Sequence, residues 1–127
     1  MSKAENMQAA LRRWMRAWPD ADGSCIPALF AQDAVYSECY GPEYHGRAQI
    51  ARWFADWNAD GRVLRWDCKR LLCADGTVIA EWYFECEHGG AHSAFDGVTL
   101  ADFDENGQIV CLKEFQSDVS HTCPYET

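Results

Sequence analysis

The sequence contains no apolar run that approaches the roughly 18 residues of a membrane span, and positively charged side chains are few. Eleven Lys and Arg stand against 20 Asp and Glu, which gives a net charge of −9 and a pI near 4.7. Because such a surface repels phosphate backbones and anionic lipids, we expect neither nucleic acid nor a membrane as a partner. Residues 1–16 form an amphipathic helical pattern without the apolar centre of a signal peptide, so we expect a cytoplasmic protein.

Signatures of metal and cofactor binding are also missing. The seven cysteines include no Cys-x-x-Cys pair, and none lies at zinc-ligand spacing with a nearby His. His88 and His92 flank a turn, but a metal site there needs a third ligand such as Glu87. No glycine-rich phosphate loop or nucleophile elbow is present. We therefore expect reduced thiols, no metal and no cofactor.

Length and composition predict one folded unit. The 127 residues are 48% hydrophobic and 24% charged, as in ordinary globular proteins, and two halves would be too small for separate cores. We expect a single domain over residues 1–127, with a core at about 3–120 and a tail or lid at 117–127. Aromatic residues reach 13%, with six Trp, which is more than a small core requires.

Helical patterns occupy the first half of the chain. Apolar residues at i, i+4, i+7 and i+11 predict a first helix that Pro19 and Asp20 stop, and Ser24 is a candidate cap for a short second helix. A strand is predicted over 34–40, and a third helix ends near Asn58. From residue 62 the period changes to two, with turn signals at 74–76, 89–90 and 106–107. This order predicts an α+β fold whose second half is a four-stranded antiparallel meander.

The strand periodicity also predicts which side chains face inward. Even positions of the strand that contains Trp82 and Phe84 are apolar, and directly opposed residues share a face. Two-residue turns at 89–90 and 106–107 then set the pairs Phe84–Phe95, Ala80–Thr99, Thr99–Glu114 and Gly97–Gln116. Glu114 and Gln116 are therefore predicted to point into the core. Burying a carboxylate without a partner costs several kcal/mol of desolvation free energy, so a buried Glu114 is a candidate functional residue.

The preceding strand depends on the turn at 74–76. A three-residue loop keeps Leu64, Trp66 and Cys68 on the inner face, whereas a two-residue turn inverts them. With the three-residue loop, the inner surface is mostly aromatic: Trp14, Trp18, Trp53, Trp57, Trp66, Trp82, Phe84 and Phe95. These rings either fill the core or stack on a planar ligand. We list them as candidate substrate contacts, with Thr99 and Gln116.

This arrangement resembles the nuclear-transport-factor-2-like superfamily, and more closely its SnoaL-like branch. The residues that carry the resemblance are Leu29–Val35, His45–Ile50, Phe95-Asp96-Gly97, and Gly107-Gln108-Ile109 leading to Glu114-Phe115. The resemblance implies a cone-shaped, curved antiparallel sheet around three N-terminal helices, enclosing a small-molecule pocket. The superfamily includes isomerases, cyclases, dehydratases, epoxide hydrolases and proteins without catalysis, so the fold does not decide the function.

Ketosteroid isomerase is a member of the superfamily whose first-strand carboxylate acts as the base. The resemblance places that position on Glu38, with Tyr36 on the same strand face. The family's tyrosine falls on Trp14 and its protonated aspartate on Thr99, so this mechanism is not carried over. What remains is Glu38 and Glu114 as candidate acid and base, with Tyr36 and Gln116 as hydrogen-bond donors to a substrate oxygen.

These observations leave more than one function open. The resemblance implies a cofactor-free isomerase, cyclase or dehydratase acting on an apolar polycyclic or aromatic molecule, and the alternative is a non-catalytic ligand-binding or dimerisation module. In the second case Glu38 and Glu114 would be paired with an inward Arg such as Arg47 or Arg70. Epoxide opening by an Asp-Arg-Asp relay is a third and weaker hypothesis. A homodimer is expected through the outer sheet face, which holds Tyr83, Asp96, Ile109, Cys111 and Phe115.

Overall fold

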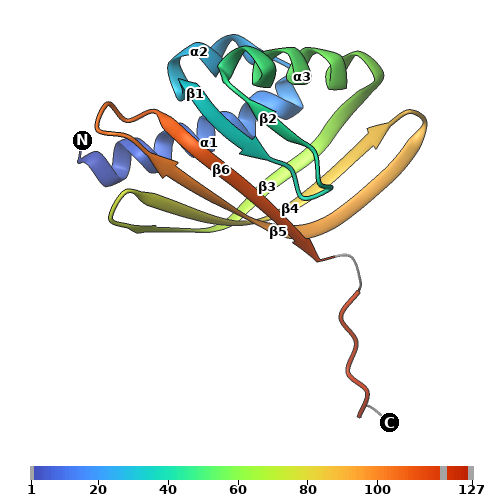
Figure 1. Cartoon of the computed structure of the whole chain (residues 1–127). Helices are drawn as coiled ribbons and strands as arrows, with labels where there is room; N and C mark the ends of the chain where they lie inside the picture. The colour runs from blue at the N-terminus through green and yellow to red at the C-terminus, as the bar shows by residue number, and fades with distance from the viewer. Residues whose placement is uncertain (1, 118–119, 126–127) are drawn as a thin grey trace.

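Three helices and six strands make up the computed structural model, which describes residues 2–117 and 120–125. The helices are α1 Lys3–Asp20, α2 Ile26–Leu29 and α3 Arg47–Asp60. The strands are β1 Phe30–Ser37, β2 Glu43–His45, β3 Gly61–Ala74, β4 Thr77–His88, β5 Ala91–Phe103 and β6 Ile109–Ser117. Figure 1 shows the helices gathered on one side of a curved sheet. The predicted α+β fold, with a cone-shaped sheet around three helices, is confirmed.

The sheet has the order β2-β1-β6-β5-β4-β3. β1 pairs in parallel with β6, so the first strand lies beside the last (Figure 1), and every other pair is antiparallel. This parallel pair makes the sheet mixed, a detail that the meander pattern of the second half did not contain. It also brings the segment after β1 next to the end of β6.

Capping and burial explain the helices at the start of the chain. The hydroxyl of Ser2 accepts a hydrogen bond from the N–H of Glu5, whose carboxylate accepts one from the N–H of Ser2. Pro19 lies within the last turn of α1 and does not end it; the left-handed Ala21, at φ 51°, does. The cap predicted at Ser24 is wrong, because the side chain of Asp22 accepts from the N–H of Ser24.

The predicted register of the last three strands is confirmed. Phe84 lies opposite Phe95, and Thr99 lies between Ala80 and Glu114 on the neighbouring strands. A bulge between Asp102 and Phe103 changes the pairing beyond it, which brings Ile109 opposite Phe103. Ile109 is therefore fully buried, and its predicted place on the outer face is wrong.

The turn between β3 and β4 also differs from the prediction. Ala74 pairs with Thr77, so the turn has two residues, and Asp75 rather than Gly76 is left-handed. The two-residue turn would invert the strand, but a bulge after Cys68 reverses its alternation and returns Trp66 and Cys68 to the inner face. A second bulge lies between Val63 and Arg65, so Val63 rather than Leu64 takes the buried position.

Two further expectations concern the membrane and the C-terminal tail. Within the described part of the chain, no helix has the length and apolar character needed to cross a bilayer. Of the predicted tail, residues 118–119 and 126–127 lie outside the described residues. Ser117 belongs to β6, and Tyr125 is 89% exposed. Whether the tail acts as a lid stays a prediction.

Candidate functional site

A cavity lies between the inner face of the sheet and the helices α1 and α3. Its lining is aromatic except for two carboxyl groups and one thiol: Trp18, Tyr36, Glu38, Cys39, Tyr40, Trp53, Trp57, Trp66, Trp82, Phe84, Phe95 and Glu114. The enclosed space measures about 40 Å³, room for a few water molecules. An open groove of about 490 Å³ adjoins it and shares Glu38, Tyr40, Trp53 and Trp57. The cavity therefore has a way out to solvent along these four side chains.

Glu114 reaches the cavity because alternate residues of β6 face inward. The hydroxyl of Tyr36, a fully buried residue of β1, donates a hydrogen bond to Oε2 of Glu114. The indole N–H of Trp14 donates to the same hydroxyl at 3.2 Å. An indole nitrogen can only donate, so the phenol oxygen accepts from Trp14 and its hydrogen goes to Glu114. The direction of this chain of hydrogen bonds is thereby fixed.

The protonation of Glu114 is set mainly by burial. Burial raises the pKa of its carboxyl to about 8, and the nearby Glu38 adds to the rise. The hydrogen bonds from Tyr36 and from the backbone N–H of Cys39 act in the opposite direction. At pH 7 this carboxyl is therefore mostly protonated, and it can give a proton to a bound molecule.

Glu38 lies just past the end of β1, in a turn. Its N–H donates to the carbonyl of Pro42 at 2.9 Å, and its carbonyl accepts from the N–H of Gly41 at 3.2 Å. The hydroxyl of Tyr44, on β2, donates to Oε1 of Glu38 at 2.6 Å. Burial raises the pKa of Glu38, while Tyr44 and the positive charge of a protonated His88 lower it. Glu38 borders both the cavity and the groove.

The ion pairs expected for a purely structural role are not formed. Arg47 donates to the backbone carbonyls of Pro27 and Phe30, and Arg70 pairs with Glu81 at 3.4 Å. Among the described residues, no Lys, Arg or His lies within ion-pair distance of Glu38 or Glu114. Two carboxyl groups with raised pKa values therefore share one aromatic cavity, which is a typical arrangement for acid and base catalysis.

The structure divides the candidate substrate contacts into two sets. Those that line the cavity are Trp18, Trp53, Trp57, Trp66, Trp82, Phe84 and Phe95. Trp14 lies behind this wall, fully buried against Tyr36. Thr99 is also behind it, and its hydroxyl accepts from the indole N–H of Trp82 at 2.8 Å. Gln116 does not line the cavity but a surface groove that shares Glu38, Cys39 and Glu114 with it, and the thiol of Cys39 donates to its Oε1 at 3.1 Å.

Several residues at the site were not among the predictions. Tyr40 and Cys39 line the cavity, and Tyr44 holds Glu38. His88 stacks on Trp57 with ring centroids 4.9 Å apart and borders the groove. Only the strand pattern of β2 could have pointed to Tyr44, and three residues are too few for a periodic signal. The indole nitrogens of Trp18 and Trp66 are buried without a hydrogen-bond partner in the described structure.

Comparison with known proteins adds a family and a fold. The model of the SnoaL-like domain matches residues 11–112. A LEH-like epoxide hydrolase from M. tuberculosis superposes with a TM-score of 0.82 at 15% identity, over 91% of this chain and 86% of that one. A hypothetical protein of ketosteroid isomerase-like fold from Catenulispora acidiphila, in complex with trimethylamine, superposes with a TM-score of 0.72 at 23% identity, over 86% of this chain and 85% of that one. A proposed polyketide cyclase from Xanthomonas campestris superposes with a TM-score of 0.74 at 19% identity, over 90% of this chain and 92% of that one. At these identities the likeness shows the fold alone.

Proposed function

We propose that this chain, which belongs to the SnoaL-like domain family, binds a small, largely apolar molecule in the cavity and transfers protons on it without a cofactor. The observation that carries the proposal is the carboxyl of Glu114, held by Tyr36 in an aromatic cavity that also contains Glu38. The two carboxyls differ in surroundings, because Glu114 lies on a strand deep in the cavity and Glu38 lies at the mouth of the groove. Such a difference in surroundings gives two carboxyl groups different pKa values, so that one can act as the acid and the other as the base.

The proposed reaction is an acid–base rearrangement next to a carbonyl group. Ionised Glu38 accepts a proton from the carbon beside the carbonyl. Protonated Glu114 donates a hydrogen bond to the carbonyl oxygen, where negative charge develops, and Tyr36 stabilises the oxygen atoms of Glu114. Return of the proton from Glu38 to a different carbon completes an isomerisation, with no net change in protons. Loss of a hydroxyl group as water, protonated by Glu114, would instead complete a dehydration. Attack of the carbanion on a second carbonyl, followed by return of the proton from Glu38 to the alkoxide that forms, would complete a cyclisation.

The shape of the site supports a ligand with an extended apolar part. The inner cavity is small, but the groove beside it is open and includes the rings of Tyr44, Trp53 and Trp57. An aromatic or polycyclic body fits along the groove, with its reactive end turned towards Glu38. Epoxide opening through an arginine-bridged pair is not favoured, because no arginine is among the residues that line the cavity.

The alternative is a module that binds a ligand without changing it. That hypothesis needs the carboxyls to be structural, with ordinary pKa values and cationic partners. Burial raises the pKa of both Glu38 and Glu114, and Arg47 and Arg70 bind elsewhere. Catalysis is therefore the better supported of the two.

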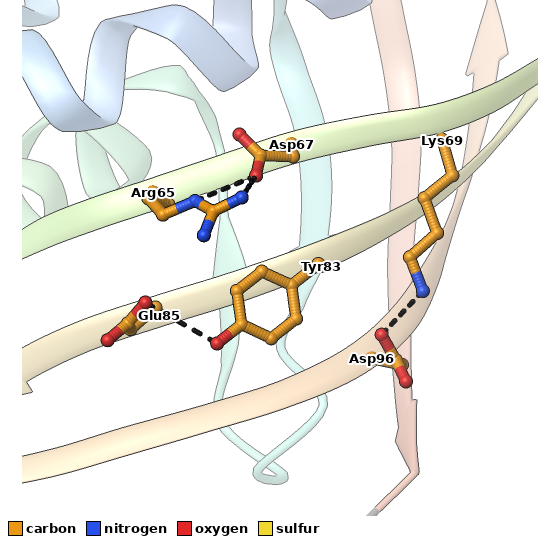
Figure 2. Close-up of polar contacts among 6 residues, drawn as sticks. All are labelled: Arg65, Asp67, Lys69, Tyr83, Glu85 and Asp96. Carbon is orange, nitrogen blue, oxygen red and sulfur yellow. Dashed lines mark hydrogen bonds and ion pairs between the residues drawn. The ribbon is translucent and has the colours of Figure 1, made fainter.

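We also propose a homodimer through the outer face of the sheet. Figure 2 shows this face at β3, β4 and β5, where Lys69 pairs with Asp96 at 2.6 Å and Arg65 bonds to Asp67. Arg65 also lies over the ring of Tyr83, 5.3 Å from its centroid. Phe115, on β6, is 54% exposed on the same sheet. An exposed ring beside self-contained ion pairs is compatible with a protein interface.

Two coarser expectations complete the proposal. No disulfide joins cysteines within the described part of the chain, which supports a reducing compartment such as the cytoplasm. The strands from both halves of the chain share one sheet, which supports one domain over residues 1–127.

Native mass spectrometry of the purified protein tests the binding and the dimer together. We expect a dimer that carries a co-purified aromatic or polycyclic molecule, whose mass identifies the substrate to be used for turnover. Glu38→Gln and Glu114→Gln should each lower kcat by ~10²- to 10⁴-fold on that substrate. Wild-type turnover by both variants would contradict the catalytic roles and favour the binding module.

A further inference from the structure

The lining of the cavity has one sign of charge. Its aromatic rings present negatively polarised faces, and the carboxyl groups among its lining residues are those of Glu38 and Glu114. None of the described residues that line it is Lys, Arg or His. His88 borders the adjoining groove, where it stacks on Trp57, and Lys113 lines the surface groove around Gln116. The site therefore attracts positive charge and repels anions such as phosphates and carboxylates.

We propose that the ligand carries a cationic nitrogen, a protonated or quaternary amine, which binds at the opening of the cavity to the groove, between the indole rings and the carboxylate of Glu38. This inference rests on the proposed function and defines the substrate class further: an apolar body in the groove with an amine at its inner end. Aromatic rings and carboxylates together are the side chains that recognise substituted ammonium groups in proteins.

The angles between the rings favour a compact group over a flat one. Around Trp18, the rings of Trp53, Trp57 and Trp66 lie with centroids at 5.0, 5.4 and 6.4 Å and are inclined by 53°, 82° and 75°. A planar ligand cannot stack on rings that are so steeply inclined to one another. A roughly spherical ammonium group can contact several of them where the cavity opens to the groove.

The parallel rings lie elsewhere. Tyr44 stacks on Trp53 at 14°, with centroids 4.6 Å apart, and Trp57 stacks on His88 at 24°. All four of these residues border the groove. The flat part of a ligand therefore finds its parallel surfaces in the groove, and the opening of the cavity is left for the compact end.

The carboxyl groups supply the second part of the argument. Oε2 of Glu114 accepts from Tyr36 and Oε1 of Glu38 accepts from Tyr44, but neither carboxyl has a cationic partner among the described residues. A cation in the cavity provides that partner for the ionised Glu38. Glu114 keeps its proton and remains the acid of the proposed reaction.

The test compares tetramethylammonium with tert-butanol, which has a similar size and shape but no charge. Binding to the full-length protein is followed by tryptophan fluorescence and by calorimetry at pH 7, with sodium chloride added to equalise ionic strength. We expect tetramethylammonium to bind at least tenfold more tightly. Calorimetry in buffers of different ionisation enthalpy should show almost no proton release on its binding, since Glu38 is already ionised and Glu114 keeps its proton. The other titratable side chains that line the cavity or the groove are Tyr36, Cys39, Tyr40, Tyr44, Asp56, Cys86 and His88, and repeating the experiment in His88→Gln removes the basic group among them.

Variants connect the preference to the ionised carboxyl. Glu38→Gln should weaken tetramethylammonium binding at least tenfold and leave tert-butanol binding unchanged, whereas Glu114→Gln, which replaces a protonated carboxyl by a neutral amide, should change neither by more than about threefold. Glu105→Gln, an exposed position in the turn after β5, is the matched control and should change neither. Glu38 lies outside the strands, so its variant keeps the test valid if Glu114→Gln does not fold.

Equal binding of the two probes, or no binding of tetramethylammonium, would overturn the inference. The proposed function fails differently, through wild-type turnover by the Gln variants on the co-purified molecule. Tight binding of tert-butanol alone would therefore reject a cationic ligand and leave acid–base catalysis on a neutral substrate in place.

Discussion

The hydroxyl of Tyr36 donates a hydrogen bond to the carboxyl of Glu114, which joins β1 to β6 between residues 78 positions apart in the sequence. The parallel pairing of these two strands places Tyr36 directly beside Leu112, two residues from Glu114. On its other side the same hydroxyl accepts from Trp14 on α1. Helix, first strand and last strand thus converge on one ionisable group.

Replacing Tyr36 should change the pKa of Glu114 in a defined direction. The hydrogen bond from Tyr36 lowers that pKa, so Tyr36→Phe should raise it above its value of about 8. Titration of the side-chain carboxyl carbons by ¹³C NMR measures the change. An unchanged or lower pKa would mean that Tyr36 does not stabilise the ionised form. Tyr83→Phe, on the outer face, is the control and should leave the Glu114 titration where it is.

The stability of the protein should decrease as the pH rises towards 8. The folded state raises the pKa of Glu114 from its ordinary 4.5 to about 8, so between these values the folded state binds more protons than the unfolded state. The free energy of unfolding should therefore fall with a slope of at most about 1.4 kcal/mol per pH unit from this group. Urea denaturation between pH 5.5 and 8 measures the slope. Glu114→Gln should flatten it and Glu105→Gln should not; equal slopes in all three proteins would contradict the assignment.

The pH profile of turnover should follow the two carboxyls. Activity needs Glu114 protonated, so kcat/KM should fall as the pH rises through about 8. On the acid side, activity should fall once Glu38 takes up a proton, at a pH above the usual range for Glu because burial raises its pKa. In Tyr36→Phe the alkaline limb should move to higher pH. An alkaline limb that does not move would show that a group other than Glu114 causes the loss of activity at high pH.

Gly97 should be intolerant of a side chain. A Cβ at this position would lie 2.5 Å from the carbonyl oxygen of Phe115 and would overlap the ring of Trp82, which lines the cavity. Gly97→Ala should therefore lower the free energy of unfolding by about 1–3 kcal/mol and displace Trp82. Chemical denaturation and near-ultraviolet circular dichroism measure the two effects. Gly76→Ala, where the new Cβ would lie at an ordinary 3.5 Å from the carbonyl oxygen of Phe103, is the control and should be milder.

The sequence was sufficient for the fold and for most of the sheet register. Period-two alternation and the Gly89-Gly90 turn determine the pairing of Phe84 with Phe95, and the same parity carries Glu114 to the inner face. The failures come from bulges. An extra residue between Val63 and Arg65 or near Phe103 reverses the alternation without any composition signal, so Leu64 and Ile109 were assigned to the wrong environments.

The candidate site was only partly accessible from sequence. Glu114 follows from strand parity, and Glu38 from the family resemblance. The hydrogen bond from Tyr44 to Glu38 depends on β2, a strand of three residues, which is too short to show a periodic pattern in the sequence. The exclusion of Arg47 and Arg70 as partners depends on where long flexible side chains end, which three-dimensional packing decides.

The two carboxyls are attached to the fold in different ways. Glu114 belongs to an inner strand of the sheet, bonded on both sides, whereas Glu38 is carried by a turn closed between its own backbone, Gly41 and Pro42. Insertions or substitutions in that turn can relocate Glu38 while the sheet stays intact. Variation among related proteins should therefore concentrate at the Glu38 side of the site, so that one conserved acid could serve a changing set of substrates.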